Sequence, residues 1–317
     1  MKALFQLIRW QNLLMTALVV WLMEKMVAAP LMDKALFGEQ LPGWVFYLLM
    51  LAVVFVAAGG YAINDYFDVK IDSINRPDRL IVTRELSKQQ AMLVHQLMTG
   101  TGVALGLITA VWLRSWSVGL VFVLVPGLLW FYSSAYKRQF VVGNLIVSLC
   151  AGMVPLLVAM ANTAVLNKRY GSDVMQYSGL PHDLYVWIGG FAFFAFLTTL
   201  VREILKDLQD QTGDRELECH TLPVLLGETW TKVILTVLIG LLAGSACYAV
   251  LRLMPFGHTW SSMPVRYLTF GLLVPLVCEL YLLWSARIPS DYRFAQGLMK
   301  FIMLLGVLFS IVIKVQL

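Results

Sequence analysis

The chain has 317 residues, of which 59% are hydrophobic and only 14% are charged, and its mean hydropathy is +0.75. A soluble domain is nearer a quarter charged, so this composition excludes a protein that faces water on all sides. It predicts an integral, polytopic membrane protein with lipid as its main solvent. The net charge of +5 comes without a long basic run, which gives no support to a nucleic-acid partner.

Taken in chain order, the apolar segments predict an all-α bundle of about nine transmembrane helices. Most of them are long enough to cross a hydrocarbon core of about 30 Å. We expect them at residues 11–29, 42–64, 91–113, 116–134, 141–162, 184–202, 231–253, 266–285 and 297–315. Nothing resembles a soluble appendage, so we expect a single transmembrane domain over residues 1–317.

The Lys and Arg residues predict how the bundle is inserted, because cytoplasmic segments carry an excess of them. With the N-terminus inside, the inner segments carry roughly twice as many Lys and Arg residues as the outer ones. We therefore expect a cytoplasmic N-terminus and an external C-terminus, which agrees with an odd number of spans.

Two acidic motifs follow the second and the sixth predicted helix, both on the inner side. They share the pattern D-x-x-D-x-x-x-D, at Asp65, Asp68 and Asp72 and at Asp207, Asp210 and Asp214. Because four helices separate the motifs, they predict two pseudo-repeated units, helices one to four and five to eight, with a ninth helix added.

Steps of three and four residues place side chains on one face of a helix. On that face Asn64 joins the first motif and Glu203 joins the second, and we expect Gly213 to interrupt regular helix before Asp214. Like charges at this spacing repel, at the negative end of the helix dipole, so the arrangement is costly unless a cation binds. Mg²⁺ takes one or two carboxylates together with water and phosphate oxygens. The motifs therefore predict metal ions shared with a diphosphate, whereas a solvated acidic loop does not predict the same spacing twice.

A bound diphosphate also needs direct positive charge, which Arg supplies as a fork and Lys as a point charge. The candidate substrate-binding residues are Arg76, Arg79, Lys137, Arg138, Arg202 and Lys206. Each can also be explained as positive-inside anchoring. Lys137 is favoured, because Tyr132 and Tyr136 accompany it in YSSAYKR.

At this point three stretches resemble a known family. NDYFDVKID, with the NRP that follows it, resembles the first aspartate motif of the UbiA superfamily of intramembrane prenyltransferases. KDLQDQTGD resembles the second motif, and YSSAYKR resembles the tyrosine–lysine element between them. The runs NDYFDVKIDSINRPDR and REILKDLQDQTGD look most like the branch of (geranylgeranyl)glyceryl phosphate geranylgeranyltransferases. The resemblance covers nearly the whole chain.

The resemblance implies a bundle around a central cavity that moves a prenyl group from its diphosphate to a lipophilic acceptor, with Mg²⁺ as cofactor. One metal side would be held by Asn64, Asp68 and Asp72, with Asp65 close by, and the other by Asp207, Asp210 and Asp214. Lys137, with Tyr132 nearby, and Arg76 would meet the diphosphate.

The acceptor must lose a proton, and Asp72, Asp65 or solvent is a candidate to take it. Because both motifs lie on the inner side, we expect the active site on the cytoplasmic side of a bacterial or archaeal cell membrane, and no obligate protein partner is indicated.

Two alternatives to this interpretation differ in their chemistry. The first is an aromatic acceptor, as in the making of quinone or haem precursors, because the aspartate motifs report on the donor and not on the acceptor. The second is a cation-coupled transporter, which would need polar groups near the bilayer midplane. The predicted helix centres are almost free of charge, with Glu279 as the main exception.

Overall fold

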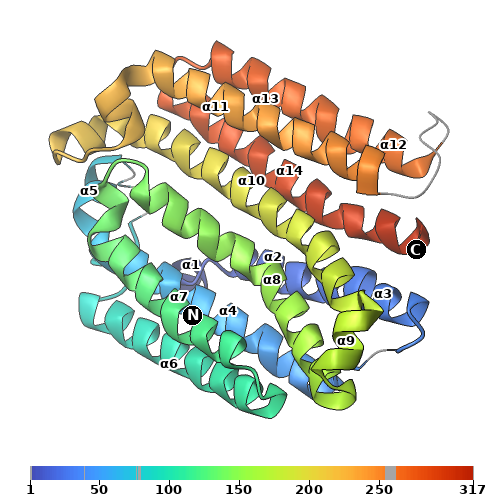
Figure 1. The fold of residues 1–317 in the computed structure, drawn as a ribbon. Helices are drawn as coiled ribbons and strands as arrows, with labels where there is room; N and C mark the ends of the chain where they lie inside the picture. Colours follow the sequence, from blue (N-terminus) through green and yellow to red (C-terminus); the bar gives the residue numbers. More distant parts are fainter. Residues whose placement is uncertain (1, 39, 76, 78–79, 254–261, 317) are drawn as a thin grey trace. The chain divides into compact units, whose positions relative to one another are not determined.

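The computed structural model describes residues 2–38, 40–75, 77, 80–253 and 262–316. Within these ranges the chain is almost entirely helical, and it contains no β-strand (Figure 1). Nine helical segments of the described chain are long and apolar enough to cross a membrane. The predicted all-α membrane fold is therefore confirmed.

The first four spans and their connections are built from short and long helices. They are α1 (Lys2–Leu7), α2 (Trp10–Leu22), the π-helix η1 (Met23–Ala28), α3 (Ala29–Lys34), α4 (Gly43–Phe67), α5 (Val69–Asn75), α6 (Lys88–Leu113), α7 (Trp116–Ser134) and the 3₁₀ turn η3 (Tyr136–Arg138). The remaining elements are α8 (Val142–Tyr170), α9 (Ser172–Ser178), α10 (Leu180–Glu216), α11 (Leu222–Tyr248), η4 (Ala249–Leu253), α12 (Met263–Tyr267), η5 (Leu268–Leu273), α13 (Val274–Ser285) and α14 (Pro289–Gln316).

Several helices are longer than the apolar segments that predicted them. The largest difference is α10, which continues to Glu216, whereas the apolar segment ends at residue 202. The expectation that Gly213 interrupts this helix was wrong, because α10 continues through it. An apolar window marks the part of a helix that lies in hydrocarbon, but helical hydrogen bonds continue into the polar region where the residues allow it.

The described chain forms two compact units, and each is described by itself. The first comprises Met1–Lys137 and Met153–Gly189, and the second comprises Arg138–Gly152 and Gly190–Leu317. The chain passes from one unit to the other between the fourth and fifth spans, after Lys137, and again within α8 and within α10. The predicted duplication of four spans and the predicted central cavity stay predictions, as does the single domain over residues 1–317.

In the first unit, glycines let α4 and α6 approach closely. A methyl group on Gly102 of α6 would lie 2.7 Å from the backbone nitrogen of Val56 on α4. The same two helices are joined where the His95 ring nitrogen Nδ1 lies 2.9 Å from the carbonyl oxygen of Gly59. This packing supports the C-terminal end of α4, which carries the aspartates of the first motif.

In the second unit, hydrogen bonds join α11 to α13 and α14. The ammonium of Lys232, on α11, is buried and donates to the carbonyl of Ala286 at 2.9 Å. It also pairs with Glu228 at 2.7 Å, and the hydroxyl of Tyr292 on α14 donates to the same carboxylate at 2.7 Å. These bonds satisfy a buried charge where the start of α11, the end of α13 and the start of α14 meet.

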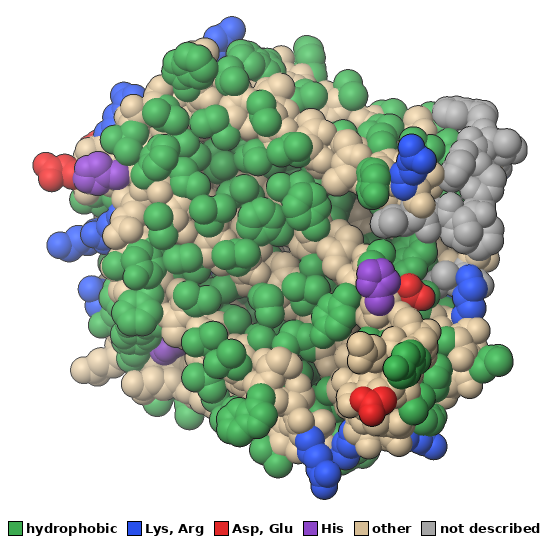
Figure 2. All heavy atoms as spheres, in the orientation of Figure 1, with side chains coloured by type: hydrophobic (Ala, Val, Ile, Leu, Met, Phe, Trp, Pro, Cys, Tyr) green, Lys and Arg blue, Asp and Glu red, His purple; other side chains and the backbone are tan. Residues whose placement is uncertain are grey.

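Large apolar side chains remain exposed on the spans, and they cover much of the face drawn in Figure 2. Val111, Trp116 and Val277 are among the most exposed. In water such a surface would drive association, whereas in a bilayer it contacts lipid chains.

Two carboxyl side chains in the described spans are fully buried. Glu24, in η1, is fully buried and accepts a hydrogen bond from the side-chain amide of Asn162 at 2.6 Å. Glu279, on α13, is also fully buried. The acidic motifs, in contrast, lie at the ends of α4 and α10, as the sequence predicts.

Candidate active site

The first motif lies where α4 ends and α5 begins. Asp68 is the C-cap of α4, and its N–H donates to the carbonyl of Asn64 at 3.0 Å. Asp72 lies on α5 and donates its N–H to the carbonyl of Asp68 at 2.8 Å. The helical hydrogen-bond pattern therefore passes across Asp68 and keeps the motif near helical spacing.

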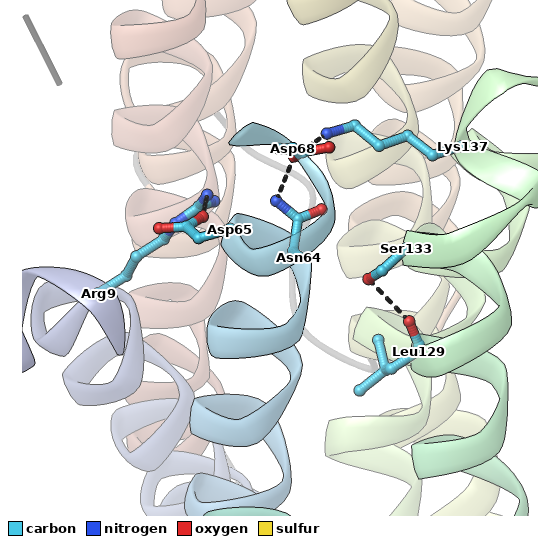
Figure 3. Close-up of polar contacts among 7 residues, drawn as sticks. All are labelled: Arg9, Asn64, Asp65, Asp68, Leu129, Ser133 and Lys137. Atoms are coloured by element: carbon cyan, nitrogen blue, oxygen red, sulfur yellow. Dashed lines mark hydrogen bonds and ion pairs between the residues drawn. The ribbon is translucent and has the colours of Figure 1, made fainter. Parts of the chain in front are cut away.

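Asp68 is held between an amide and an ammonium group (Figure 3). The side chain of Asn64 donates to Oδ2 of Asp68 at 2.7 Å, and the ammonium of Lys137 forms an ion pair with the same oxygen. The carboxylate is only 6% exposed. Because burial makes an unpaired charge costly, Lys137 stabilises the ionised form of Asp68.

Lys137 belongs to the tyrosine–lysine element and lies in the short turn η3, which follows α7. Burial disfavours its charged form, but the charges of Asp68, Tyr132 and Asp72 and the hydrogen bond to Asp68 outweigh burial and raise the pKa of Lys137 above its ordinary value. Lys137 is therefore a cation at neutral pH. The structure thus brings Asp68, Asp72, Tyr132 and Lys137 into one electrostatic cluster, as predicted.

Asp65 turns to a different partner. Its carboxylate accepts a hydrogen bond from the guanidinium of Arg9 at 2.7 Å, on another side of α4 from the Asp68–Lys137 pair (Figure 3). Arg9 joins α1 to α2 with φ 50° and ψ 55°, a left-handed backbone that costs a non-glycine residue about 1–2 kcal/mol. Burial opposes the charge of Arg9, but Asp65, Tyr61 and Asp68 together raise its pKa. Sequence reasoning assigned Arg9 only to membrane orientation.

In the second unit, Asp207 is the centre of a corresponding cluster on α10. The side-chain amide of Asn144, on α8, donates to Oδ2 of Asp207 at 2.8 Å. The carboxylates of Asp214 and Glu203 and the ammonium of Lys206 lie within Coulombic range of it. Asn144 lies 63 residues from Asp207 in the chain and was not predicted.

The third aspartate of this motif is tied to the loop that follows α10. Asp214 is 4% exposed, and the hydroxyl of Thr221 donates to its Oδ2 at 3.0 Å. The N–H of Cys219 donates to the backbone carbonyl of Asp214 at 2.8 Å. Asp214 therefore orders the connection to α11, in addition to any contact with a metal.

A comparison with known protein families identifies the family that carries these motifs. Residues 13–305 match the model of the UbiA prenyltransferase family. The chain belongs to the UbiA prenyltransferase family.

Curated relatives in this family are similar over most of their length. The digeranylgeranylglyceryl phosphate synthase of Methanopyrus kandleri is 32% identical over 308 residues, which is 97% of each chain. The enzyme of the same name from Ignicoccus hospitalis is 29% identical over 313 residues, 97% of this chain and 91% of the relative. The predicted superfamily and the predicted class of activity, prenyl transfer, are confirmed at the level of the family.

Solved structures of the family share the fold. One comes from work on digeranylgeranylglyceryl phosphate synthase in membranes; it has a TM-score of 0.65 and 21% identity, with 100% of this chain and 99% of that chain covered. A UbiA homolog from Archaeoglobus fulgidus bound to GPP and Mg²⁺ has a TM-score of 0.59 and 14% identity, over 98% and 99% of the two chains. The predicted magnesium thus has a counterpart in a protein of this fold.

The UbiA motifs of this chain suit a metal that is shared with phosphate. Among the described residues, no three His, Cys, Asp or Glu side chains gather into a metal-binding group of their own. Mg²⁺ needs only one or two carboxylates from a protein when water and phosphate oxygens complete its shell. The motifs offer carboxylate and amide oxygens as ligands, which is the donor chemistry that Mg²⁺ prefers.

The remaining predicted cations have different surroundings. Arg202 pairs with Glu203, and Lys206 lies near Asp207. Arg138 is exposed, and its backbone carbonyl accepts the N–H of His220 at 2.9 Å. The predicted residues Arg76 and Arg79 lie outside the described residues.

Proposed function

We propose that this UbiA prenyltransferase moves a geranylgeranyl group from its diphosphate to the hydroxyl of a prenylglyceryl phosphate, with Mg²⁺ as cofactor. The observation that carries the proposal is the similarity to the digeranylgeranylglyceryl phosphate synthase of M. kandleri, 32% identical over 97% of each chain. Similarity of that extent includes both aspartate motifs and the segments between them.

The aspartate motif of each unit would hold metal. Asn64, Asp68 and Asp72 are the proposed ligands in the first unit, and Asp207, Asp210 and Asp214 are those in the second. When bound, Mg²⁺ supplies Lewis-acid neutralisation of the leaving diphosphate.

The chain's own side chains support this chemistry. Lys137 is a cation beside Asp68, and phosphate oxygens would replace the Asp68 carboxylate as its partner when the donor binds. Such preorganised charge is usually a large part of catalysis. We assign the acceptor's proton to Asp72 rather than to Asp65, because Asp65 is turned toward Arg9. The apolar spans would keep water away from the reacting carbon.

We also propose how the enzyme is placed in the cell. The excess of Lys and Arg on one side supports a cytoplasmic N-terminus and active site and an external C-terminus, in the cell membrane of a bacterium or archaeon. Its partners in this proposal are the prenyl diphosphate, the lipophilic acceptor and membrane lipid, without nucleic acid or an obligate protein partner.

Diphosphate release by the purified protein in detergent tests the proposal. Geranylgeranyl diphosphate is supplied with geranylgeranylglyceryl phosphate or with a hydroxybenzoic acid, in Mg²⁺ and after EDTA. We expect release that requires both Mg²⁺ and the glyceryl phosphate, and that returns when Mg²⁺ is added in excess of EDTA. Release that requires the aromatic acid would contradict the acceptor, and release unaffected by EDTA would contradict the cofactor.

A further inference from the structure

Two cations flank the first motif, each bound to a different aspartate. Lys137 pairs with Asp68, and Arg9 pairs with Asp65 on another side of α4 (Figure 3). The reaction proposed above brings together two anionic substrates, a diphosphate donor and a phosphate-bearing acceptor. Their phosphate groups repel each other, so each needs its own cation while their reacting atoms meet.

Arg9 has hydrogen-bonding capacity beyond its ion pair. A guanidinium carries five N–H donors in a planar fork, and the contact with Asp65 uses one terminal nitrogen. The side chain is 36% exposed, so part of it can be reached from outside the protein. Arg is also the side chain best suited to bind phosphate with two parallel hydrogen bonds.

The guanidinium is fixed in position by several contacts. Its central carbon lies 5.1 Å from the centre of the Tyr61 ring, and Asp65 holds one end of the fork. The left-handed backbone of Arg9 turns the chain from α1 into α2. Asp68 also lies within Coulombic range of Arg9, which places Arg9 beside the first aspartate motif.

The surroundings of Arg9 suit the tails of an amphiphile. Leu4 and Phe5 on α1 and Trp10 and Leu14 on α2 are exposed apolar residues, from 41% to 60%, in the chain segments on both sides of Arg9. A partly exposed arginine between two segments with exposed apolar side chains matches a lipid that has an anionic headgroup.

We propose that Arg9 binds the phosphate monoester of the acceptor lipid and that Asp65 positions the guanidinium for it. This inference rests on the proposed function. In this proposal the two substrates use different residues at the first motif. Asp68 and Lys137 act at the donor, and Asp65 and Arg9 act at the acceptor.

Steady-state kinetics of Arg9→Lys in the full-length protein test the proposal. Lysine keeps the charge but loses the fork, so we expect the KM for geranylgeranylglyceryl phosphate to rise on the order of 10–100-fold. The KM for geranylgeranyl diphosphate and kcat at saturating acceptor should stay within about twofold, since neither depends on the acceptor's phosphate. Asp65→Asn, which loosens the guanidinium, should raise the same KM by a smaller factor.

Lys88→Gln is the matched control. The ammonium of Lys88 lies 5.9 Å from the centre of the Tyr66 ring, also on α4, but Lys88 has no ion pair with either Asp65 or Asp68 in the described structure. Its acceptor KM should equal that of the wild type. An acceptor KM raised equally in Lys88→Gln would overturn the proposal, because a substitution at a basic residue away from Asp65 would then have the same effect as loss of the Arg9 fork.

A binding measurement without donor keeps the two proposals apart. Phosphatidic acid, a phosphate-monoester lipid that cannot be the specific acceptor, should compete with labelled geranylgeranylglyceryl phosphate for the wild type and much less for Arg9→Lys. Glycerol phosphate without tails should not compete. If the wild type transfers the prenyl group but Arg9→Lys binds and uses the acceptor normally, the Arg9 site is wrong and the proposed function stands. If the wild type shows no transfer to the glyceryl phosphate, the proposed function itself fails before any variant is compared.

Discussion

At the scale of single residues, the candidate site combines partners that are near in the chain with partners that are far apart. Asn64 contacts Asp68 one helical turn away, and this contact follows from the spacing of the motif. The bonds from Arg9 to Asp65 and from Asn144 to Asp207 join residues 56 and 63 positions apart. Sequence spacing predicts contacts within a helix, but contacts between helices depend on which faces pack together, and the motif does not encode that.

The first prediction concerns removal of the Asp68 carboxylate. Asp68→Ala removes a proposed metal ligand and leaves the half-buried Lys137 without its carboxylate partner. Loss of one such charge stabiliser typically costs on the order of 10²–10³ in rate, so we expect kcat to fall by about that factor, and Asp210→Ala to fall similarly. Diphosphate release by each purified variant gives the measurement.

Asp33→Ala is the control for these variants, because Asp33 is an exposed carboxylate on α3 outside both motifs. It should keep the wild-type rate. All variants should elute as folded, detergent-solubilised protein in size-exclusion chromatography. Near-full activity of Asp68→Ala or Asp210→Ala would show that the carboxylate concerned is not a metal ligand in turnover.

At the scale of helices, the structure shows why one glycine of α6 differs from another. A methyl group on Gly102 would lie 2.7 Å from the nitrogen of Val56 and 2.9 Å from the carbonyl oxygen of Ala52, both in the backbone of α4. A methyl group on Gly100 would meet no atom within 4 Å. Backbone cannot move aside as a flexible side chain can, so α4 and α6 would have to separate in the first case only.

Alanine substitutions at Gly102 and Gly100 should therefore differ in their effect on stability. Gly102→Ala should lower the free energy of unfolding by about 1–3 kcal/mol through overpacking. Gly100→Ala should leave it unchanged or raise it by about 0.5–1 kcal/mol, because alanine favours the helix. Thermal unfolding of both variants in the same detergent measures the difference. A lower melting temperature for Gly100→Ala than for Gly102→Ala would contradict the close packing of α4 on α6.

At the scale of the whole molecule, the proposed orientation has a direct test. The nine candidate spans of the described chain would place the two termini on opposite sides, and the distribution of Lys and Arg predicts that the N-terminus lies inside. A fluorescent protein that matures only in the cytoplasm should be bright when fused before residue 1 and dark when fused after residue 317. An alkaline phosphatase fused after residue 317 should be active outside. The reverse pattern would contradict a cytoplasmic active site.

The sequence by itself determined the membrane class, the number of spans and the two aspartate motifs with the tyrosine–lysine element. Hydrophobicity over about 20 residues and helical spacing are local properties, so they can be read from the sequence without knowledge of the tertiary structure. The predicted sixth span ends at residue 202, whereas α10 continues to Glu216. Polar residues mark the edge of the bilayer and not the end of a helix. Only the tertiary structure showed that Asp65 and Asp68 have different partners, because Asp65 pairs with Arg9. It also showed the partners of the second motif, which are Asn144 at Asp207 and Thr221 at Asp214. Those contacts arise when helices distant in the chain pack against one another, and the geometry of that packing is set by many small side chains at once.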